Sequence, residues 1–600
     1  MNEILSRYCP RIDFDSYEDF FDNYTCNVPE DFNFAYDVVD EWAALQPEKL
    51  ALLWTDDTEV IKTYTFTEMK RLSDKAANVL LTLGVKKGDV VKLILKQRPE
   101  VWIMMCALSK IGAVCIPGTY QLTAQDLEYR CNIADVKLLI TVDDAYLLEN
   151  IAAVRSKCHK LEKIAVVGNT IPDGYIDLRR EIEKASEHFS RISTATKDPM
   201  LIYFSSGTTG MPKMVIHNHS LPLGHIVTAK YWHCAEDNGV HLTQTDSGWA
   251  KFAWGKIYGQ WICGATVGVY DTEKVTPKGM LDAIQRLRPV TFCAPATVFR
   301  YLIKEDLSGY DFSFIRHTSM AGEPLSPEVY KKIEELTGLK IHEGFGQSET
   351  SVMAAVFKWL PVRPGSMGKP APLFGIKLID ENNEVCDVGM VGNMSITNAG
   401  KNMFEQKEEK TTEYTEFHRG KKVNPEITPN SSVSSVVKNV PVVGASAFAG
   451  IFCGYWKDEA VTRNVWNNGI YKTGDMAWRD NDGYLWFVGR NDDVIKCSGY
   501  RIGPFEVESA LMEHPSVLEC AVTAAPDPMR GQVVKATIVL ARGFSPSDEL
   551  KRELQNHVKR VTAPYKYPRI VEFAAELPKT ASGKIQRNVI RKKDNTENES

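Results

Sequence analysis

Residues 201–213 read Leu-Ile-Tyr-Phe-Ser-Ser-Gly-Thr-Thr-Gly-Met-Pro-Lys, and the interpretation of the rest of the chain starts from this stretch. Its apolar first residues predict a buried strand, and the hydroxyl-rich break predicts a loop at the carboxyl end of that strand. Glycines let backbone N–H groups approach an anion closely, hydroxyl groups donate hydrogen bonds, and the lysine adds positive charge. This combination is typical of a loop that binds polyphosphate.

The spacing of this stretch differs from that of the Walker phosphate loop. The Walker motif has four residues between its glycines, followed by Gly-Lys-Ser/Thr. Here two residues separate Gly207 from Gly210, and Met-Pro precedes Lys213. Taken alone, the stretch could also be a polar surface loop between two elements, so its function depends on motifs elsewhere in the chain.

Short β-branched runs lie on both sides of this stretch and alternate with segments of helical periodicity. The alternation predicts βαβ units and a mostly parallel sheet. In open α/β sheets, ligands bind outside the carboxyl ends of the strands, where the 205–213 loop is expected to lie. The runs are Val91–Leu95, Leu138–Val142, Ile164–Val167, Val290–Ala294 and His317–Ala321.

The two ends of the chain show other patterns. Phe34–Trp42 has the pattern of an amphipathic helix that leads into the core. From Tyr471 onward the pattern is α+β, and 592–600 form a polar tail. We expect strands at Trp486–Val488, Ala521–Ala524 and Ala536–Leu540, and helices at Phe505–Glu513 and Asp548–Lys559.

Length and composition indicate a multidomain globular protein without a nucleic-acid signature. A chain of 600 residues exceeds the size at which one core keeps growing, so at least two domains are expected. The chain is 44% hydrophobic and 25% charged, and its formal net charge is -6. No basic surplus favours nucleic acid as a partner. The 13 cysteines include no C-x-x-C pair or metal-ligand spacing, as in an intracellular protein with reduced thiols.

The sequence shows no targeting or membrane-spanning signal that we recognise. The first 22 residues carry Asp and Glu from residue 3 onward and have no apolar core, unlike a signal or transit peptide. The most apolar stretch, Val101–Pro117, is shorter than a membrane span and contains Lys110. We therefore expect a cytoplasmic enzyme, a monomer or homo-oligomer.

The composition changes abruptly over residues 398–447. The segment is rich in Glu, Lys, Asn, Pro and Ser, and has too little apolar surface to offset the entropy of ordering. We predict a mobile polar insert. It could serve regulation or partner binding, it could be a tolerated insertion, or it could belong to no functional design.

Further motifs follow the 205–213 stretch in order along the chain. Each is weak alone, and together they are specific. They are Glu343-Gly-Phe-Gly-Gln-Ser-Glu-Thr350, Tyr471-Lys-Thr-Gly-Asp475, Gly489-Arg-Asn-Asp-Asp493, Ser498-Gly-Tyr-Arg-Ile-Gly-Pro504 and Pro578-Lys-Thr-Ala-Ser-Gly-Lys-Ile585.

With these motifs the chain resembles the adenylate-forming superfamily of acyl-CoA synthetases, luciferases and nonribosomal adenylation domains. Finer segments resemble its medium-chain acyl-CoA synthetase branch. They are Ser247-Gly-Trp249, Ala321-Gly-Glu-Pro-Leu325, Tyr500–Leu511, Pro526–Gly531 and Thr562–Arg569. The resemblance implies that a carboxylate attacks the α-phosphate of ATP to give an acyl-adenylate and pyrophosphate. The thiol of CoA then displaces AMP.

The resemblance also implies an α/β fold in two domains. The large N-terminal domain, residues 1–490, is expected to consist of parallel αβ subdomains plus a small β-barrel-like part. A small, mobile α+β lid domain, residues 491–600, is expected to follow. The polar insert departs from the family pattern, which has a much shorter connection between Gly389–Ile396 and Ile451–Tyr455. If it disturbs that strand pairing, the fold near Asp475 could suffer.

For the adenylation step, the resemblance implies an ATP site assembled from several motifs. Cations and positioned donors suit this step, because phosphoryl groups carry the developing charge. Thr350 and Glu349 fall where the family contacts the α-phosphate and binds Mg²⁺, with Glu349 as the metal ligand. Asp475 and Arg490 fit the ribose-contacting pair, and Lys584 fits the lysine that bridges the acid and the α-phosphate. The residues implied to bind the β- and γ-phosphates are Ser205, Ser206, Gly207, Thr208, Thr209, Gly210 and Lys213. Those implied to bind the adenine are Glu343, Gly344, Phe345, Gly346, Gln347 and Ser348.

For the thioester step, the resemblance implies that the C-terminal domain rotates about Asp492. One face then presents Lys584, and the other presents Ser498, Gly499 and Tyr500 beside the pantetheine tunnel. Hinge residues absorb such changes in φ and ψ. Arg501 is a candidate for ATP contact, and Arg530, Lys559 and Arg569 are candidates for CoA contact; each of these four could equally be a solvated surface charge. The resemblance adds Tyr567 and Pro568 for CoA, and Gln121 as a weaker candidate.

Large rings follow Gly248 where the family lines its acid site. Trp249, Lys251 and Trp254 are the candidates for the acyl pocket, and bulky indoles predict a short pocket for small or branched acids. These rings could instead pack the core, and for Trp261 the two interpretations are equally weighted.

Two other functional classes stay open at this stage. A domain that activates amino acids or aryl acids would share the motifs, but no carrier domain follows Lys584. A catalytically inactive binding protein would use the insert as its interaction element, although Lys584, Asp475 and Thr350 are all present.

Overall fold

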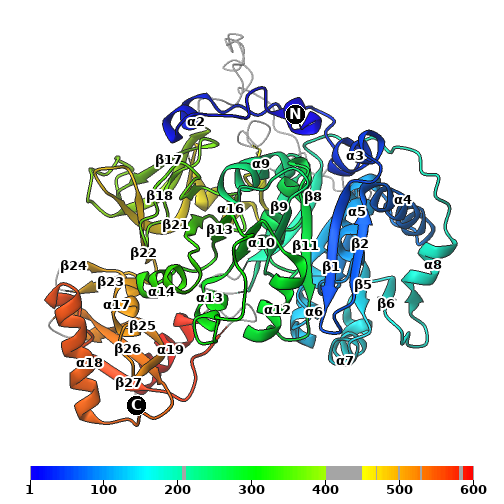
Figure 1. Cartoon of the computed structure of the whole chain (residues 1–600). Coiled ribbons are helices and arrows are strands. Elements are labelled where there is room, and N and C mark those ends of the chain that lie inside the picture. Colours follow the sequence, from blue (N-terminus) through cyan, green and yellow to red (C-terminus); the bar gives the residue numbers. More distant parts are fainter. Residues whose placement is uncertain are drawn as a thin grey trace, which may run out of the picture.

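Two large, mostly parallel sheets form the N-terminal part of the protein (Figure 1). The computed structural model describes residues 2–205, 211–399, 449–467, 469–497, 500–527, 530–579 and 585–598. The predicted parallel αβ architecture is confirmed. Of the insert predicted over 398–447, the backbone of residues 398–399 continues a strand, and residues 400–448 lie outside the described chain.

The first sheet has eight strands in the order β19-β9-β8-β4-β3-β5-β6-β7. The strands from β8 to β7 are parallel, whereas β9 and β19 run antiparallel at one edge. In chain order they are β3 Val90–Ile94, β4 Val114–Pro117, β5 Val136–Val142, β6 Lys163–Val167, β7 Ile176–Asp177, β8 Pro199–Ser205, β9 Lys213–Asn218 and β19 Gly454–Tyr455.

The second sheet has nine strands in the order β16-β15-β14-β13-β12-β10-β11-β1-β2. Its central strands are parallel, and its two edges are antiparallel. The strands are β1 Leu50–Asp56, β2 Ile61–Thr65, β10 Val240–Thr243, β11 Thr266–Asp271, β12 Thr291–Ala294, β13 His317–Met320, β14 Ile341–Phe345, β15 Ala354–Ala355 and β16 Lys369–Pro370.

Helices cover these sheets, and several of them begin at a residue whose side chain caps the first turn. Thr65 and Glu68 form a capping box at the start of α4, and Thr123 and Asp126 form one at α6, so that each side chain satisfies a free backbone N–H group. The helices are α4 Phe66–Thr82, α5 Glu100–Ile111, α6 Ala124–Ile133, α7 Ala145–Val154, α8 Leu178–Lys184, α9 Leu221–Val227, α10 Ala250–Gly255, α11 Tyr258–Ile262, α12 Pro277–Leu287, α13 Ala296–Leu302 and α14 Pro327–Thr337.

A five-stranded antiparallel sheet corresponds to the predicted small β part. It consists of β17 Phe374–Ile379, β18 Gly392–Ala399, β20 Trp466–Asn467, β21 Ile470–Arg479 and β22 Leu485–Arg490, and α16 Glu459–Val465 lies between β18 and β20 in the chain. Strands β18 and β21 flank the insert and pair with each other. The insert therefore leaves the strand pairing that leads to Asp475 intact.

The C-terminal elements form a separate small α+β unit with its own hydrophobic core (Figure 1). Its strands are β23 Ile495–Cys497, β24 Tyr500–Ile502, β25 Val517–Asp527, β26 Gly531–Leu540 and β27 Ile570–Phe573. Its helices are α17 Pro504–Met512, α18 Asp548–Val561 and α19 Arg587–Asn598. The predicted strands and helices of this region are confirmed, but the polar tail is helical as far as Asn598.

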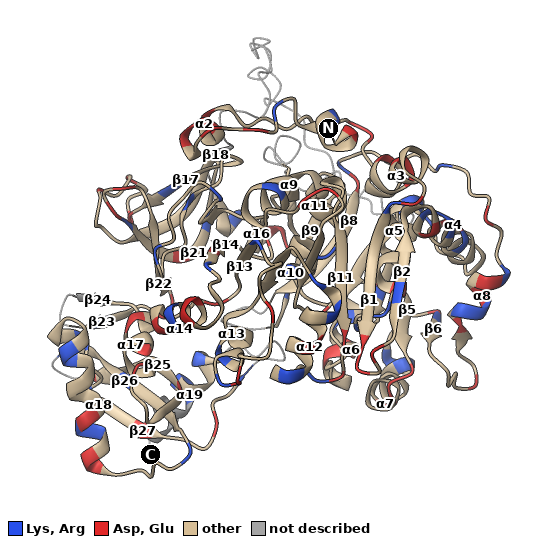
Figure 2. Cartoon of the chain, viewed as in Figure 1, with Lys and Arg blue, Asp and Glu red and all other residues tan. Residues whose placement is uncertain are grey.

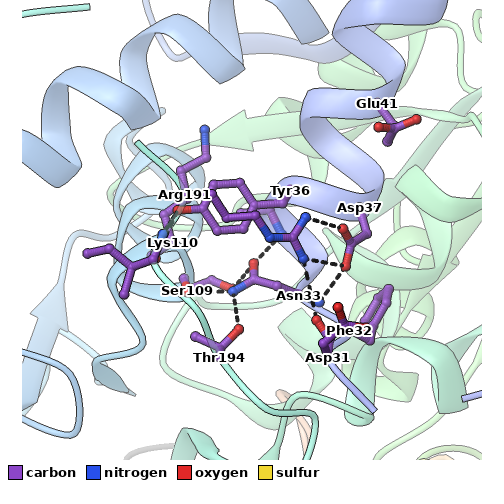
Figure 3. Close-up of polar contacts among 12 residues, drawn as sticks. Asp31, Phe32, Asn33, Tyr36, Asp37, Glu41, Ser109, Lys110, Arg191 and Thr194 are labelled. Atoms are coloured by element: carbon purple, nitrogen blue, oxygen red, sulfur yellow. Dashed lines mark hydrogen bonds and ion pairs between the residues drawn. The ribbon is translucent and has the colours of Figure 1, made fainter. Parts of the chain in front are cut away.

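Buried polar contacts hold the N-terminal segment against α5 and the segment that precedes β8 (Figure 3). Asn33 Nδ2 donates to Ser109 O over 2.8 Å and to Thr194 Oγ1 over 3.1 Å. The guanidinium of Arg191 lies over the ring of Tyr36. The helix predicted over Phe34–Trp42 is instead π-helical over Ala35–Asp40, and α3 follows as Glu41–Leu45. Two short helices precede it, α1 Glu3–Tyr8 and α2 Tyr17–Asn23.

Charged side chains are mixed in sign along surface helices such as α8 and α18, while the strands of the large sheets are mostly uncharged (Figure 2). In the part of the chain that the structure describes, no helix is long and apolar enough to cross a membrane.

Candidate active site

The 205–213 stretch is the turn between two paired strands. Ser205 ends β8 and Lys213 begins β9, and these two residues are opposite each other in the antiparallel ladder. The predicted strand is thus confirmed, and both ends of the loop are held by the sheet. The candidates Ser206, Gly207, Thr208, Thr209 and Gly210 lie outside the described residues.

The adenine candidates lie at the end of β14 against two indole rings. A Cβ atom on Gly344 would collide with the ring of Trp232, and one on Gly346 would collide with Trp254. The two glycines therefore let the strand lie directly on the aromatic layer. Phe345 points to the other side, where its ring centroid lies 6.2 Å from that of Phe487.

Glu343 is buried at the base of this strand. Its Oε1 accepts a hydrogen bond from the backbone N of Gly365 over 2.9 Å. Burial raises the pKa of Glu343 to about 8, against the opposing effect of backbone hydrogen bonds. A protonated carboxyl is then able to donate as well as accept, so Glu343 acts as a polar anchor for the strand.

Gln347 joins the adenine strand to the sheet that carries Asp475. Gln347 Nε2 donates to Asp475 Oδ2 over 2.5 Å and to Thr473 O over 3.0 Å. Gln347 Oε1 accepts from the hydroxyl of Tyr471 over 2.8 Å. Its backbone N donates to Thr350 Oγ1 over 3.1 Å. All functional groups of Gln347 are therefore occupied, which fixes the relative position of two distant motifs.

Asp475 and Arg490 are paired across β21 and β22. They are direct partners in the antiparallel ladder, and Arg490 lies 3.5 Å from Asp475 Oδ1. Asp475 is 4% exposed, so its carboxylate is held in a low-dielectric setting beside a cation. The arrangement leaves a rigid carboxylate at the edge of the cluster, as recognition of a diol requires.

Glu349 and Lys213 meet at the ring of Tyr455. The Tyr455 hydroxyl donates to Glu349 Oε1 over 2.9 Å, and Lys213 Nζ lies 5.1 Å from the centroid of the same ring. Burial raises the pKa of Glu349, while the hydrogen bond from Tyr455 and the charge of Arg490 oppose this shift. A buried carboxylate of this kind gains from a nearby cation.

The single carboxylate of Glu349 fits a magnesium ion whose other ligands come mainly from a substrate. The described residues contain no cluster of three or more His, Cys, Asp or Glu side chains that would hold a metal alone. Magnesium is commonly held by one or two carboxylates together with substrate phosphates. A single carboxylate close to Lys213 agrees with that mode.

The acyl-pocket candidates occupy two different environments. Trp249 and Lys251 are half-buried, and Lys251 Nζ donates to Ala321 O over 2.9 Å. Trp254 is buried and meets Trp232 edge to face, with ring centroids 6.0 Å apart. Trp261 is fully buried and donates to Ala51 O, so it belongs to the core.

The C-terminal candidates Lys559, Tyr567 and Arg569 form one cluster. Lys559 Nζ lies 4.0 Å from the ring centroid of Tyr567, and Arg569 NH1 donates to the Tyr567 hydroxyl over 2.8 Å. Pro568 is buried, whereas Arg530 and, on the N-terminal part, Gln121 are exposed. Tyr500 and Arg501 lie on β24 with undescribed side chains, and Ser498, Gly499 and Lys584 lie outside the described residues.

Asp492, the hinge candidate, follows the ladder residue Arg490. Arg591 of α19 donates to Asp492 O over 3.4 Å and to Asp493 Oδ1 over 2.5 Å. The backbone N of Asn491 donates to Gly474 O over 2.8 Å. The hinge candidate thus lies between the backbone hydrogen bond of Asn491 and the ion pair of Asp493 with Arg591.

Sequence reasoning missed several residues of this site. Tyr455, Tyr471 and His217 contact Glu349, Gln347 and Ser348, and none of the three was predicted as a site residue. His217 Nε2 donates to Ser348 O over 2.7 Å, and burial lowers the pKa of His217 to about 4, so the ring is neutral. Tyr471 opens the motif that ends at Asp475, which was its one available signal.

Comparisons with known proteins agree with this geometry. A family model described as AMP-binding enzyme matches residues 39–405, and one described as AMP-binding enzyme C-terminal domain matches 506–584. The chain is 38% identical over 590 residues to mouse acyl-coenzyme A synthetase ACSM3, mitochondrial, covering 97% of this chain and 94% of that protein. It is 39% identical over 576 residues to human acyl-coenzyme A synthetase ACSM5, mitochondrial, covering 94% and 91%. The crystal structure of the anthranilate CoA ligase AuaEII in complex with anthranoyl-AMP superposes with a TM-score of 0.81 at 26% identity, covering 96% and 99%.

Proposed function

The chain belongs to the AMP-binding enzyme family, and on that premise we propose that it is an AMP-forming acyl-CoA synthetase for short- to medium-chain or branched fatty acids. The observation that carries the proposal is the contact between the adenine strand and Asp475 through Gln347. It brings two motifs of the nucleotide site together from separate sheets.

In the proposed first step, a carboxylate oxygen of the acid attacks the α-phosphorus of ATP, and pyrophosphate leaves. Lys213 and the 205–210 loop hold the departing phosphates, Asp475 and Arg490 hold the ribose, and Thr350 contacts the α-phosphate. Lys584 bridges the acid and the α-phosphate. A Mg²⁺ ion bound through Glu349 would neutralise phosphate charge. The residues supply positioning and electrostatic stabilisation, and none forms a covalent bond.

In the proposed second step, the sulfur of CoA attacks the acyl carbonyl, and AMP leaves with the C–O bond electrons. Domain boundaries at 1–490 and 491–600, with a rotation about Asp492, remain part of this proposal. The cluster of Lys559, Tyr567 and Arg569 offers two cations and an aromatic face, which suit a nucleotide that carries phosphates. Arg530, Gln121 and the Ser498–Tyr500 segment complete the proposed CoA contacts.

Trp254 supports the preference for small or branched acids. The buried ring lies between Gly346 of the adenine strand and Trp232, so it limits depth beside the proposed acyl site. Lys251 and Trp249 lie three and five residues earlier, are less buried, and would contribute the wall nearer the solvent.

The test is a panel of acids from C2 to C12, with branched and aromatic members, assayed by pyrophosphate release with and without CoA. We expect acid-dependent pyrophosphate release, conversion to acyl-CoA, and preference below C6. Preference for C8 or longer would contradict the narrow pocket. Absence of both half-reactions with every acid would reject the function.

A second candidate is the activation of aryl acids, which the likeness to an anthranilate CoA ligase favours. Higher kcat/KM for benzoate-type acids than for every aliphatic acid would select it. An inactive binding protein is a third. This assignment would be supported if no acid were activated and deletion of residues 398–447 abolished a partner complex.

The cytoplasmic location is also a proposal. The names of the relatives include the word mitochondrial, so a mitochondrial enzyme is the competing assignment. Fractionation of cells expressing the tagged chain distinguishes them.

A further inference from the structure

Lys92 differs from the other buried lysines of this protein. The described residues contain seven lysines that are less than one-tenth exposed, and six of them donate to an oxygen acceptor. Lys92 is 0% exposed, and its Nζ has no hydrogen-bond partner. The six partnered lysines are Lys49, Lys75, Lys96, Lys110, Lys256 and Lys535.

A second cation lies beside Lys92 and is also incompletely paired. Lys92 Nζ and Arg130 Cζ lie 5.7 Å and 4.9 Å from the ring centroid of Phe204. Arg130 Nε is buried without an acceptor, and its nearest carboxylate, on Asp126, is 3.8 Å away. Two cations therefore share an aromatic ring and one partly exposed carboxylate. The arrangement has a deficit of negative charge.

This pair lies next to both ends of the polyphosphate loop. Phe204 directly precedes Ser205 on β8. Tyr129, the neighbour of Arg130 on α6, donates through its hydroxyl to Pro212 O over 3.2 Å, directly before Lys213. The cations are therefore attached to the two segments that enter and leave the loop.

Gly118 lies directly against the Lys92 amine. A Cβ atom on Gly118 would lie 3.0 Å from Lys92 Nζ, so any other residue would press on the amine. Gly118 follows β4, and the chain continues to Thr119 and to the CoA candidate Gln121. The amine therefore lies beside the first residue after the carboxyl end of β4.

We propose that Lys92 and Arg130 form an additional phosphate-binding subsite beside the 205–213 loop, in which a substrate phosphate supplies the missing negative charge. The inference rests on the proposed function. The phosphate belongs either to the pyrophosphate released from ATP or to the diphosphate of CoA. Either source presents the same oxygen acceptors, and the experiment below distinguishes them.

An unpaired buried amine is costly, and its protonation reports on the ligand. Burial, with a smaller effect from Arg130, lowers the pKa of Lys92 to about 7. The groups that face it are Arg130 and Asp126 of α6 and the thiols of Cys115 and Cys131. A phosphate beside the amine would favour the charged form, so the protein would take up protons from the buffer when the phosphate binds.

The experiment is isothermal titration of the full chain with magnesium pyrophosphate and, separately, with CoA. Each titration is run at pH 7.5 in two buffers of different ionisation enthalpy. The variants are Lys92→Met, Arg130→Gln and the matched control Lys75→Met, a buried lysine on α4 that donates to Glu183 O. For one ligand, we expect wild-type binding to take up protons. We expect Lys92→Met to bind that ligand at least about tenfold more weakly, without proton uptake.

Lys92→Met is also expected to melt at a higher temperature than the wild type, because methionine removes an unpaired buried amine. Weaker binding by a more stable variant excludes misfolding as the cause. A loss for pyrophosphate assigns the subsite to ATP, and a loss for CoA assigns it to CoA. Unchanged affinity for both ligands, or no proton uptake by the wild type, overturns the inference.

Failure of the subsite and failure of the proposed function give different results. Acid-dependent pyrophosphate release by the wild type is measured in parallel. Its absence rejects the synthetase. Its presence, with unchanged affinities in Lys92→Met, rejects the subsite alone.

Discussion

Gln347 and Asp475 are 128 residues apart in the chain, and the Gln347 amide nitrogen donates to the Asp475 carboxylate over 2.5 Å. Tyr471 donates to the other end of the same amide over 2.8 Å. The adenine strand and the antiparallel sheet thus share one side chain. Because both ends of the amide are occupied, the position of the carboxylate depends on a residue outside its own motif.

Replacing Asp475 with Asn should weaken adenylation. The change removes the negative charge that faces Arg490. It also replaces a carboxylate, which only accepts hydrogen bonds, with an amide whose NH2 group cannot accept one from Gln347 Nε2. We expect kcat/KM for ATP to fall about 10- to 100-fold for each charge-assisted hydrogen bond lost. Steady-state pyrophosphate release measures it. Asp173→Asn, at an exposed loop position, is the control and should retain full activity. Equal kcat/KM for ATP in Asp475→Asn and Asp173→Asn would contradict a role of Asp475 in binding the nucleotide.

Gly346→Ala should damage both the fold and the nucleotide site. The added methyl group collides with the ring of Trp254, and overpacking of this kind costs about 1–3 kcal/mol. Urea denaturation measures the loss, and fluorescence titration with ATP measures binding. Gly309→Ala is matched, since a Cβ atom there has no neighbour within 4 Å. The packing argument fails if Gly346→Ala is as stable as Gly309→Ala.

Lys584→Ala should separate the two half-reactions. If Lys584 bridges the acid and the α-phosphate, its loss should lower pyrophosphate release by about 100-fold or more, as for other groups that stabilise developing charge. Conversion of supplied acyl-adenylate to acyl-CoA should continue. Lys579→Ala, in the same motif but paired with Glu519, is the control. Equal loss in both half-reactions would contradict a role confined to adenylation.

Stability should fall steeply in mild acid because several buried histidines are neutral in the folded protein. Burial lowers the pKa of His217 and His219 to about 4, and that of His225, His241 and His317 to about 3. An unfolded histidine titrates near 6.5, so the unfolded chain binds more protons below that pH. The stabilisation is fully present above pH 6.5 and is lost as the pH falls toward 4. Each histidine contributes up to about 1.4 kcal/mol per pH unit.

The acid effect is partly opposed by carboxyl groups with raised pKa values. Burial raises the pKa of Glu343 to about 8, and those of Asp40 and Asp246 to about 6, so these groups stabilise the fold as the pH falls. The histidines outnumber them, and the net change is a loss. Urea midpoints measured from pH 6.5 to 5 should decrease throughout. A constant midpoint between pH 6.5 and 5.5 would refute the prediction.

Periodicity was sufficient for the strands of the first sheet. The runs at 91–95, 138–142 and 164–167 became β3, β5 and β6, because continuous β-branched residues suit a strand that is buried on both faces. The helix expected at Phe34–Trp42 was wrong in type. Its apolar residues do follow a helical pattern, but Ala35–Asp40 form a π-helix that packs against α4 and α5, and apolar periodicity does not distinguish a short π-helix from an α-helix.

The sequence by itself determined which residue types are available for phosphate, ribose and metal contact, because those types follow from local motifs and their chemistry. Only the tertiary structure decided which of them meet. Gln347 reaches Asp475, and Lys213 and Glu349 share Tyr455, through contacts between strands that no local pattern encodes. The same holds for two other residues. The burial of Trp261 in the core and the absence of a hydrogen-bond partner for Lys92 both depend on neighbours from distant segments of the chain.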